Sequence, residues 1–237
     1  MQRTDPPVST DIVISDEALH KAEEFIEAEE GAANKLQGWL QGFIVAAAFG
    51  MSAFHLYTAW AIVPTQTLRP VHVGMVLFLC FLVFPVTARF RHRIMWWDWL
   101  AAAASIAIVV YLIQGGDDFT DRNTSPETLD VVFGIGLIVL VLEAMRRTNG
   151  WIMPIITSAF IAYALFGPSL PAPWTHKGYE IGRLVGVMYM TLEGIYGVAV
   201  DVSSSLIILF TIFGAFLQYS GAGKFYIDFS FSAMGGK

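Results

Sequence analysis

Residues 39–63 read WLQGFIVAAAFGMSAFHLYTAWAIV, and this stretch decides the fold of the chain. It contains no Asp, Glu, Lys or Arg, and its single ionisable side chain is His55. A helix that crosses about 30 Å of hydrocarbon needs roughly 20 apolar residues, because each helical residue adds about 1.5 Å. The stretch is therefore predicted to be a transmembrane helix.

The composition of the whole chain indicates the same surroundings. Of the 237 residues, 55% are hydrophobic and 14% are charged, whereas ordinary soluble domains carry roughly 25% charged residues. This balance excludes a soluble enzyme and a disordered chain. No basic stripe is present, so no nucleic-acid partner is expected. Cys80 is the only cysteine, which excludes a disulfide scaffold, a zinc knuckle and an iron–sulfur cluster within one chain.

Further apolar segments extend the pattern along the chain. Five more runs are predicted to cross the membrane: residues 71–88, 99–114, 129–145, 151–166 and 202–219. Segments 179–197 and 225–234 mix apolar with charged residues, which is typical of amphipathic helices that lie in the membrane interface. The predicted fold class is an all-α polytopic membrane protein, with about six transmembrane helices plus interfacial amphipathic helices.

The distribution of Lys and Arg in short loops predicts the orientation of these helices. Loop 89–98 holds three such residues and loop 144–150 holds two, whereas loops 64–70 and 115–128 hold one each. Loops rich in Lys and Arg stay in the cytoplasm. We therefore expect a multi-pass protein of the bacterial or archaeal cytoplasmic (inner) membrane, with its N-terminus in the cytoplasm.

Residues 1–38 form a strongly acidic tail. They hold nine acidic and three basic side chains, so this segment alone carries the formal net charge of −6 of the whole chain. Apolar residues recur at helical spacing between Ser15 and Glu30, which predicts a short amphipathic helix. A signal peptide would open with a basic region followed by an apolar one, and neither is present here.

Two histidines lie in or beside predicted spans, and ionisable groups in a membrane are functional hypotheses. One hypothesis is that His55 and His72 ligate a haem iron together. The predicted helix ends place His55 about 12 Å below the outer surface and His72 about 2 Å below it, which separates them. A neutral, hydrogen-bonded structural His55 is therefore favoured, while a ligand or proton-relay role stays open.

The remaining charged residues have structural explanations. Glu143 is expected to pair with the two arginines that follow it by three and four residues. Asp201 fits the positive N-terminal end of a helix. Arg183 and Glu193 are expected on a solvated face. No convergent polar groups of an intramembrane enzyme were found, so no catalytic, cofactor-binding or metal-binding residue is assigned and no enzyme is expected.

Glycines contribute two further expectations. The spacing of Gly182 and Gly186 permits close contact between helices. Residues 221–224 read GAGK, but they lack both the earlier glycine and the following hydroxyl residue that a phosphate-binding loop requires. These glycines are expected to end a helix.

Two stretches near the C-terminal end resemble a known family. Residues 189–205 contain Glu-Gly-Ile-Tyr-Gly, and residues 209–228 contain Phe-Gly-Ala-Phe-Leu followed by Ser-Gly-Ala-Gly. They resemble the start of the large permease domain in fused TRAP (tripartite ATP-independent periplasmic) transporters, of the type paired with TAXI solute-binding proteins.

The resemblance implies a division of the chain. Four parts follow one another along the chain. Residues 1–38 would be a cytoplasmic tail, and residues 39–148 would form four small-permease-like helices. Residues 149–175 would form a connecting transmembrane helix and a Pro-rich turn, and residues 176–237 would be the truncated start of the large-permease domain.

The resemblance also implies a function. This portion would be the membrane-anchored scaffold of a sodium-coupled secondary importer of organic acids, with a periplasmic solute-binding protein as partner. The hairpins that bind sodium and substrate would belong to a transport domain downstream of residue 237, so no substrate-binding residues and no bound cofactor are assigned here. The alternative is a haem- or quinone-binding membrane anchor of a redox complex.

Overall fold

The computed structural model describes residue 21, residues 33–34 and residues 36–235. Within these residues every regular element is a helix, which confirms the all-α fold class. Six helical segments of this described part are long and apolar enough to cross a membrane, as predicted. The predicted helix between residues 15 and 30 lies outside the described residues.

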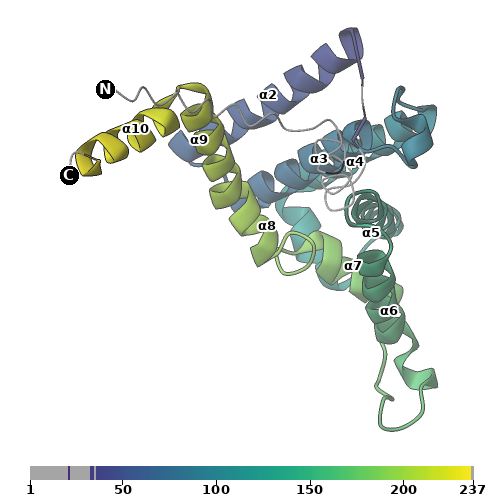
Figure 1. Cartoon of the computed structure of the whole chain (residues 1–237). Helices are drawn as coiled ribbons and strands as arrows, with labels where there is room; N and C mark the ends of the chain where they lie inside the picture. Colours follow the sequence, from purple (N-terminus) through teal and green to yellow (C-terminus); the bar gives the residue numbers. More distant parts are fainter. Residues whose placement is uncertain (1–20, 22–32, 35, 236–237) are drawn as a thin grey trace, which may run out of the picture.

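The six candidate spans follow one another along the chain (Figure 1). They are α2 (Trp39–Trp60), α3 (Thr65–Val83), α4 (Trp96–Asp121) with the turn that follows it to Thr124, α5 (Thr128–Asn149), α6 (Ile152–Phe166) with the turn that follows it to Ser169, and a composite of α8 (Val198–Val202), the π-helical η4 (Ser203–Ile207) and α9 (Ile208–Tyr219). The shorter elements are η1 (Ala88–Phe90), η2 (Arg122–Thr124), η3 (Gly167–Ser169), α7 (Ile181–Met190) and α10 (Ala222–Met234).

The core of the molecule forms around α3, which packs along α4. Phe81 and Leu82 of α3 are fully buried, and Leu137 of α5 joins them in the same apolar cluster. Figure 1 shows α3 and α4 together at the centre, while α6 and α10 extend away in different directions. The packed pair of α3 and α4 is therefore the central part of the molecule.

Helix α7 packs into this core through one face. Val185 and Tyr189 are fully buried, and the Tyr189 hydroxyl donates a hydrogen bond to the Ile108 carbonyl in α4 at 3.0 Å. Burial raises the pKa of the Tyr189 phenol, which keeps its proton for this bond. A Cβ on Gly186 would collide with the backbone oxygen of Asn123 in η2. The predicted close approach at Gly186 is therefore present, against η2 rather than against another long helix.

Several element boundaries differ from the sequence prediction. Helix α3 begins at Thr65 rather than at residue 71, and Pro70 lies inside it. Helix α4 continues to Asp121 across a kink at Gly116, whose φ is 54°. The predicted helix over 179–197 is shorter, because α7 ends at Met190 and a turn follows in which Ile195 N donates to Met188 O at 2.9 Å.

One glycine and three tryptophans lie at helix ends. Gly221 adopts a left-handed conformation with φ 74° between α9 and α10, as expected for a glycine at a helix end, whereas Gly223 lies inside α10 and does not end a helix. Trp39, Trp60 and Trp96 stand at helix ends and are 73%, 87% and 69% exposed. Exposed tryptophans at both ends of apolar helices are typical of a membrane interface.

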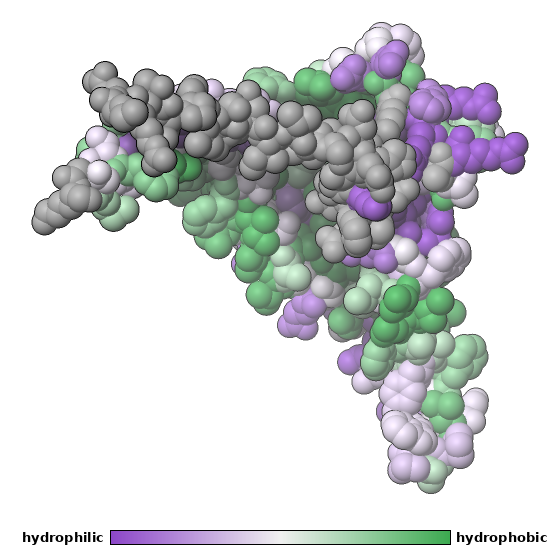
Figure 2. Space-filling model, viewed as in Figure 1, coloured by the Kyte–Doolittle hydropathy of each residue, from purple (hydrophilic) through white to green (hydrophobic). Residues whose placement is uncertain are grey.

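Apolar side chains cover much of the outer surface. Figure 2 shows them over the regions of α9 and α6, where Phe160, Phe210 and Phe213 are more than half exposed. Such a surface is stable against lipid or against further protein, and it is unfavourable in water.

Candidate functional site

A chain of polar side chains joins α2, α3 and η4 inside the apolar part of the molecule. The His55 ring is fully buried and the His72 residue is 5% exposed. His55 Nδ1 lies 2.8 Å from the Met51 carbonyl, His55 Nε2 lies 2.9 Å from His72 Nδ1, and His72 Nε2 lies 3.1 Å from Ser203 Oγ. Three separate segments of the chain therefore meet in one line of hydrogen bonds.

If both imidazoles are neutral, the Met51 carbonyl determines the direction of every bond in this line. A carbonyl only accepts, so His55 Nδ1 carries the hydrogen and His55 Nε2 is left as an acceptor. His72 Nδ1 then donates to His55, and His72 Nε2 accepts from the Ser203 hydroxyl. With neutral imidazoles, each ring carries its proton on Nδ1 in this arrangement.

The contact between the histidines corrects the sequence prediction that they lie at different depths. His55 is five residues before the end of α2, and His72 is seven residues after the start of α3. These offsets correspond to about 8 Å and about 10 Å along the two helices. The prediction was wrong because α3 was expected to begin at residue 71.

The same contact does not fit the haem hypothesis. The nitrogens of His55 and His72 that face each other are hydrogen-bonded at 2.9 Å. Two axial ligands of one iron would have to point at it from opposite sides, which leaves no direct bond between them. Within the described residues, no group of three or more His, Cys, Asp or Glu side chains is placed to hold a metal ion.

The tautomers can be tested by ¹⁵N NMR of histidine-labelled protein. We expect His55 and His72 to show a protonated Nδ1 and an unprotonated Nε2. His176 provides an internal control of the opposite kind, because its Nε2 lies 2.9 Å from the Tyr163 carbonyl and its Nδ1 accepts from Gly178 N at 3.1 Å. A protonated Nε2 on neutral His55 would contradict the assigned direction of the line.

An ion pair lies close in sequence to this line. Arg69 of α3 contacts Asp201 of α8, with Nη2–Oδ1 2.8 Å and Nε–Oδ1 3.0 Å, and its Nη1 donates to the Tyr196 carbonyl at 3.0 Å. Asp201 lies in the first turn of α8, as predicted, but its pairing with Arg69 was not predicted. We name these five side chains, His55, Arg69, His72, Asp201 and Ser203, the polar junction.

Two further charged clusters hold the ends of α4 and α5. Arg147 donates to Asp98 at 2.7 Å and to Glu143 at 2.8 Å, and Arg146 also bonds Glu143 at 2.7 Å. The predicted pairing of Glu143 with both arginines is confirmed. Asp98 was missed, since it lies 49 residues from Arg147 in the sequence.

The second of these clusters is centred on Asp130. Its carboxylate accepts from Arg122 at 2.7 Å and 2.9 Å, and from the Tyr111 hydroxyl at 2.8 Å. It also accepts from Glu127 N at 2.9 Å and so caps the start of α5. These side chains are fully engaged with one another, which indicates a structural role.

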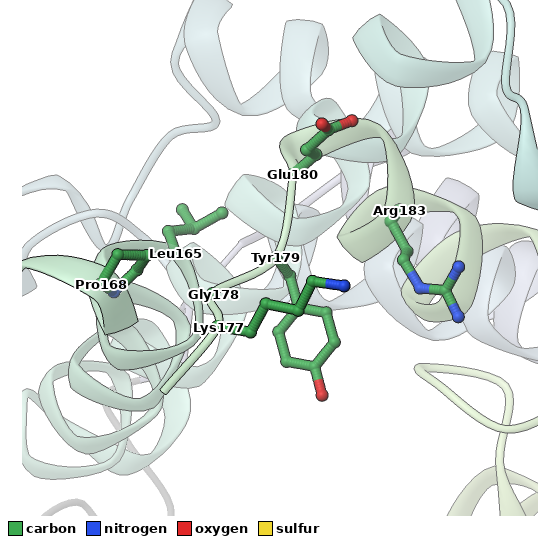
Figure 3. Close-up of a pocket in the computed structure, with 7 residues that line it drawn as sticks. All are labelled: Leu165, Pro168, Lys177, Gly178, Tyr179, Glu180 and Arg183. Atoms are coloured by element: carbon green, nitrogen blue, oxygen red, sulfur yellow. The ribbon is translucent and has the colours of Figure 1, made fainter. Parts of the chain in front are cut away.

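A cavity of about 710 Å³ lies where α6 and η3 meet the segment that leads into α7. Leu165 and Pro168 form one wall, and residues 177–180 with Arg183 form the other (Figure 3). The segment is held in place by backbone bonds from His176 N to Gly167 O and from Tyr179 N to Ala164 O. Arg183 and Glu193 are exposed, as expected.

Six apolar spans, polar clusters at their ends and exposed interfacial tryptophans define a multi-pass membrane protein. Residues 137–237 match the family described as tripartite ATP-independent periplasmic transporter, DctM component. This match confirms the resemblance to a TRAP transporter permease, which belongs to a family of transporters and implies a periplasmic solute-binding protein as partner. No curated protein and no solved structure gave a match.

The matched segment begins inside α5, so α2, α3 and α4 lie outside it. The polar junction crosses this boundary, because Ser203 and Asp201 are matched residues whereas their partners on α2 and α3 precede the match. The division of the chain at residues 149 and 176 stays a prediction.

Proposed function

We propose that this chain is the scaffold portion of a sodium-coupled TRAP-type importer of organic acids. Its partner would be a periplasmic solute-binding protein of the TAXI type, with the small and large permease parts fused in one chain. The substrate and sodium sites would lie in a transport domain that follows the described helices.

One observation carries the proposal. The polar junction joins α2 and α3 to the segment that matches the DctM component, through one ion pair and one line of hydrogen bonds. Unpairing polar groups in an apolar environment is costly, so these helices are expected to move as one body. A rigid body of this kind is what a scaffold requires while another domain moves against it.

The orientation belongs to the same proposal. Loop 84–95 contains Arg89, Arg91 and Arg93, and α5 ends with Arg146 and Arg147. The positive-inside rule favours placing both loops in the cytoplasm. The N-terminus would then be cytoplasmic, in the inner membrane of a bacterium or archaeon, and the cavity beside α6 would lie on the periplasmic side.

Transport in proteoliposomes tests the proposed function. We expect the intact permease to accumulate a radiolabelled organic acid only with the cognate solute-binding protein outside and an inward sodium gradient. Replacing sodium by potassium, or omitting the binding protein, should reduce uptake to the level of empty vesicles. Uptake that needs neither would overturn the proposal, and a Soret band in the purified protein would favour the redox-anchor alternative.

A further inference from the structure

The cavity between α6 and α7 presents two cationic side chains on one side. In Figure 3, Lys177 and Arg183 extend toward the same region beside the Tyr179 ring, whereas the Glu180 carboxylate points away from them. Among the described residues, neither Lys177 nor Arg183 forms an ion pair within 4.0 Å. The lining thus carries two cations against the single carboxylate of Glu180, which leaves a net positive charge.

The backbone adds to this positive field. Helix α7 begins at Ile181, directly beside the lining residues, and the first turn of a helix exposes N–H groups that have no partner within the helix. A helix N-terminus together with Lys and Arg favours a group with negatively charged oxygens, such as a phosphate. The cavity therefore has the chemistry of an anion site.

The surroundings of the cavity are those of a membrane interface. Trp174 and Tyr179 are 66% and 56% exposed, and they follow the end of a span that closes at Ser169. Phe166 and Ile181 place exposed apolar surface on both sides of the cavity. The aromatic rings suit the headgroup region of a phospholipid, the cations suit its phosphate, and the apolar surface suits its acyl chains.

We propose that this cavity binds one anionic phospholipid, with its phosphate between Lys177 and Arg183 and its acyl chains along the exposed apolar side of α6. The exposed residues Ile155 and Phe166 lie on one side of that helix, because they are about three full turns apart. The lipid would fill the space between α6 and α7 and brace α6 against the remainder of the scaffold. An acidic patch on a soluble partner would leave the flanking apolar surface uncovered.

Native mass spectrometry of the intact permease, first delipidated and then mixed with one added lipid at a time, tests the proposal. We expect one phosphatidylglycerol to be retained, and phosphatidylcholine to be retained far more weakly. The double variant Lys177→Gln/Arg183→Gln should weaken phosphatidylglycerol binding at least about tenfold, because two interfacial cations are lost. The conservative variant Lys177→Arg/Arg183→Lys should keep the affinity within about twofold.

A matched control removes two exposed cations elsewhere. Arg93→Gln/Lys224→Gln makes the same change in net charge and should leave retention of this lipid unchanged. Three results would each overturn the proposal. The variant Lys177→Gln/Arg183→Gln could retain phosphatidylglycerol as well as the unchanged protein does. The unchanged protein could retain phosphatidylcholine as well as phosphatidylglycerol, or inorganic phosphate could compete as strongly as the lipid. The proposal would also be overturned if Lys177→Gln/Arg183→Gln bound the lipid as before but no longer docked the solute-binding protein.

Discussion

Replacing Arg147 by methionine is expected to lower the free energy of unfolding by about 3–5 kcal/mol. The Arg147 and Asp98 side chains are 3% and 1% exposed, and their atoms Nη1 and Oδ1 lie 2.7 Å apart. Arg147 also donates to the Phe84 carbonyl at 2.9 Å and stands over the Phe81 ring at 4.9 Å. Its loss would leave the Asp98 charge buried without a counter-charge. Unfolding by steric trapping in bicelles measures the effect.

The control for this variant is Arg93→Met, because Arg93 is exposed and should change stability by no more than about 0.5 kcal/mol. The double variant Arg147→Met/Asp98→Asn should cost clearly less than the two single variants added together, since the residues are in contact. If Arg147→Met lowered the free energy of unfolding by less than about 1 kcal/mol, the Arg147–Asp98 ion pair would not stabilise the packing of α4 against α5.

Gly186→Ala is expected to destabilise the packing of α7 by about 1–3 kcal/mol. The added methyl would collide with the Asn123 backbone oxygen, and Asn123 is itself held by a bond from its Nδ2 to Thr120 O at 2.7 Å. Helix α7 would have to move outward, which would weaken the buried contacts of Val185 and Tyr189. The same unfolding measurement applies.

Gly214→Ala is the matched control for that substitution. Gly214 lies in α9, and a Cβ there meets no atom within 4 Å. It should leave stability unchanged or raise it by up to about 1 kcal/mol, because Ala favours a helix more than Gly does. Equal effects at both positions would show that helix propensity, and not close approach, determines the result.

The number and approximate position of the spans could be predicted because they depend on local properties. A run of some 20 apolar residues without charge is visible in the sequence, and the basic cluster that begins at Arg89 marks where one such run must end. The ion pairs of Glu143 could be predicted for the same reason, since their members are three and four residues apart.

The contacts of the polar junction could not be predicted, because they depend on helix ends that tertiary partners stabilise. Arg69 was interpreted as a loop residue, yet it lies inside α3, which begins at Thr65, and its side chain pairs with Asp201. A six-residue error in the start of a helix displaces a side chain by about 9 Å along its axis. That displacement was enough to separate His72 from His55 in the prediction.

The short length of α7 has a consequence for the arrangement of the chain in the bilayer. With ten residues it reaches only about 15 Å, half the thickness of the hydrocarbon layer, so it does not count as a crossing. The six candidate spans of the described part then cross the bilayer an even number of times. Residues just before Trp39 and just after Tyr219 consequently share one aqueous compartment, whichever face of the bilayer that is.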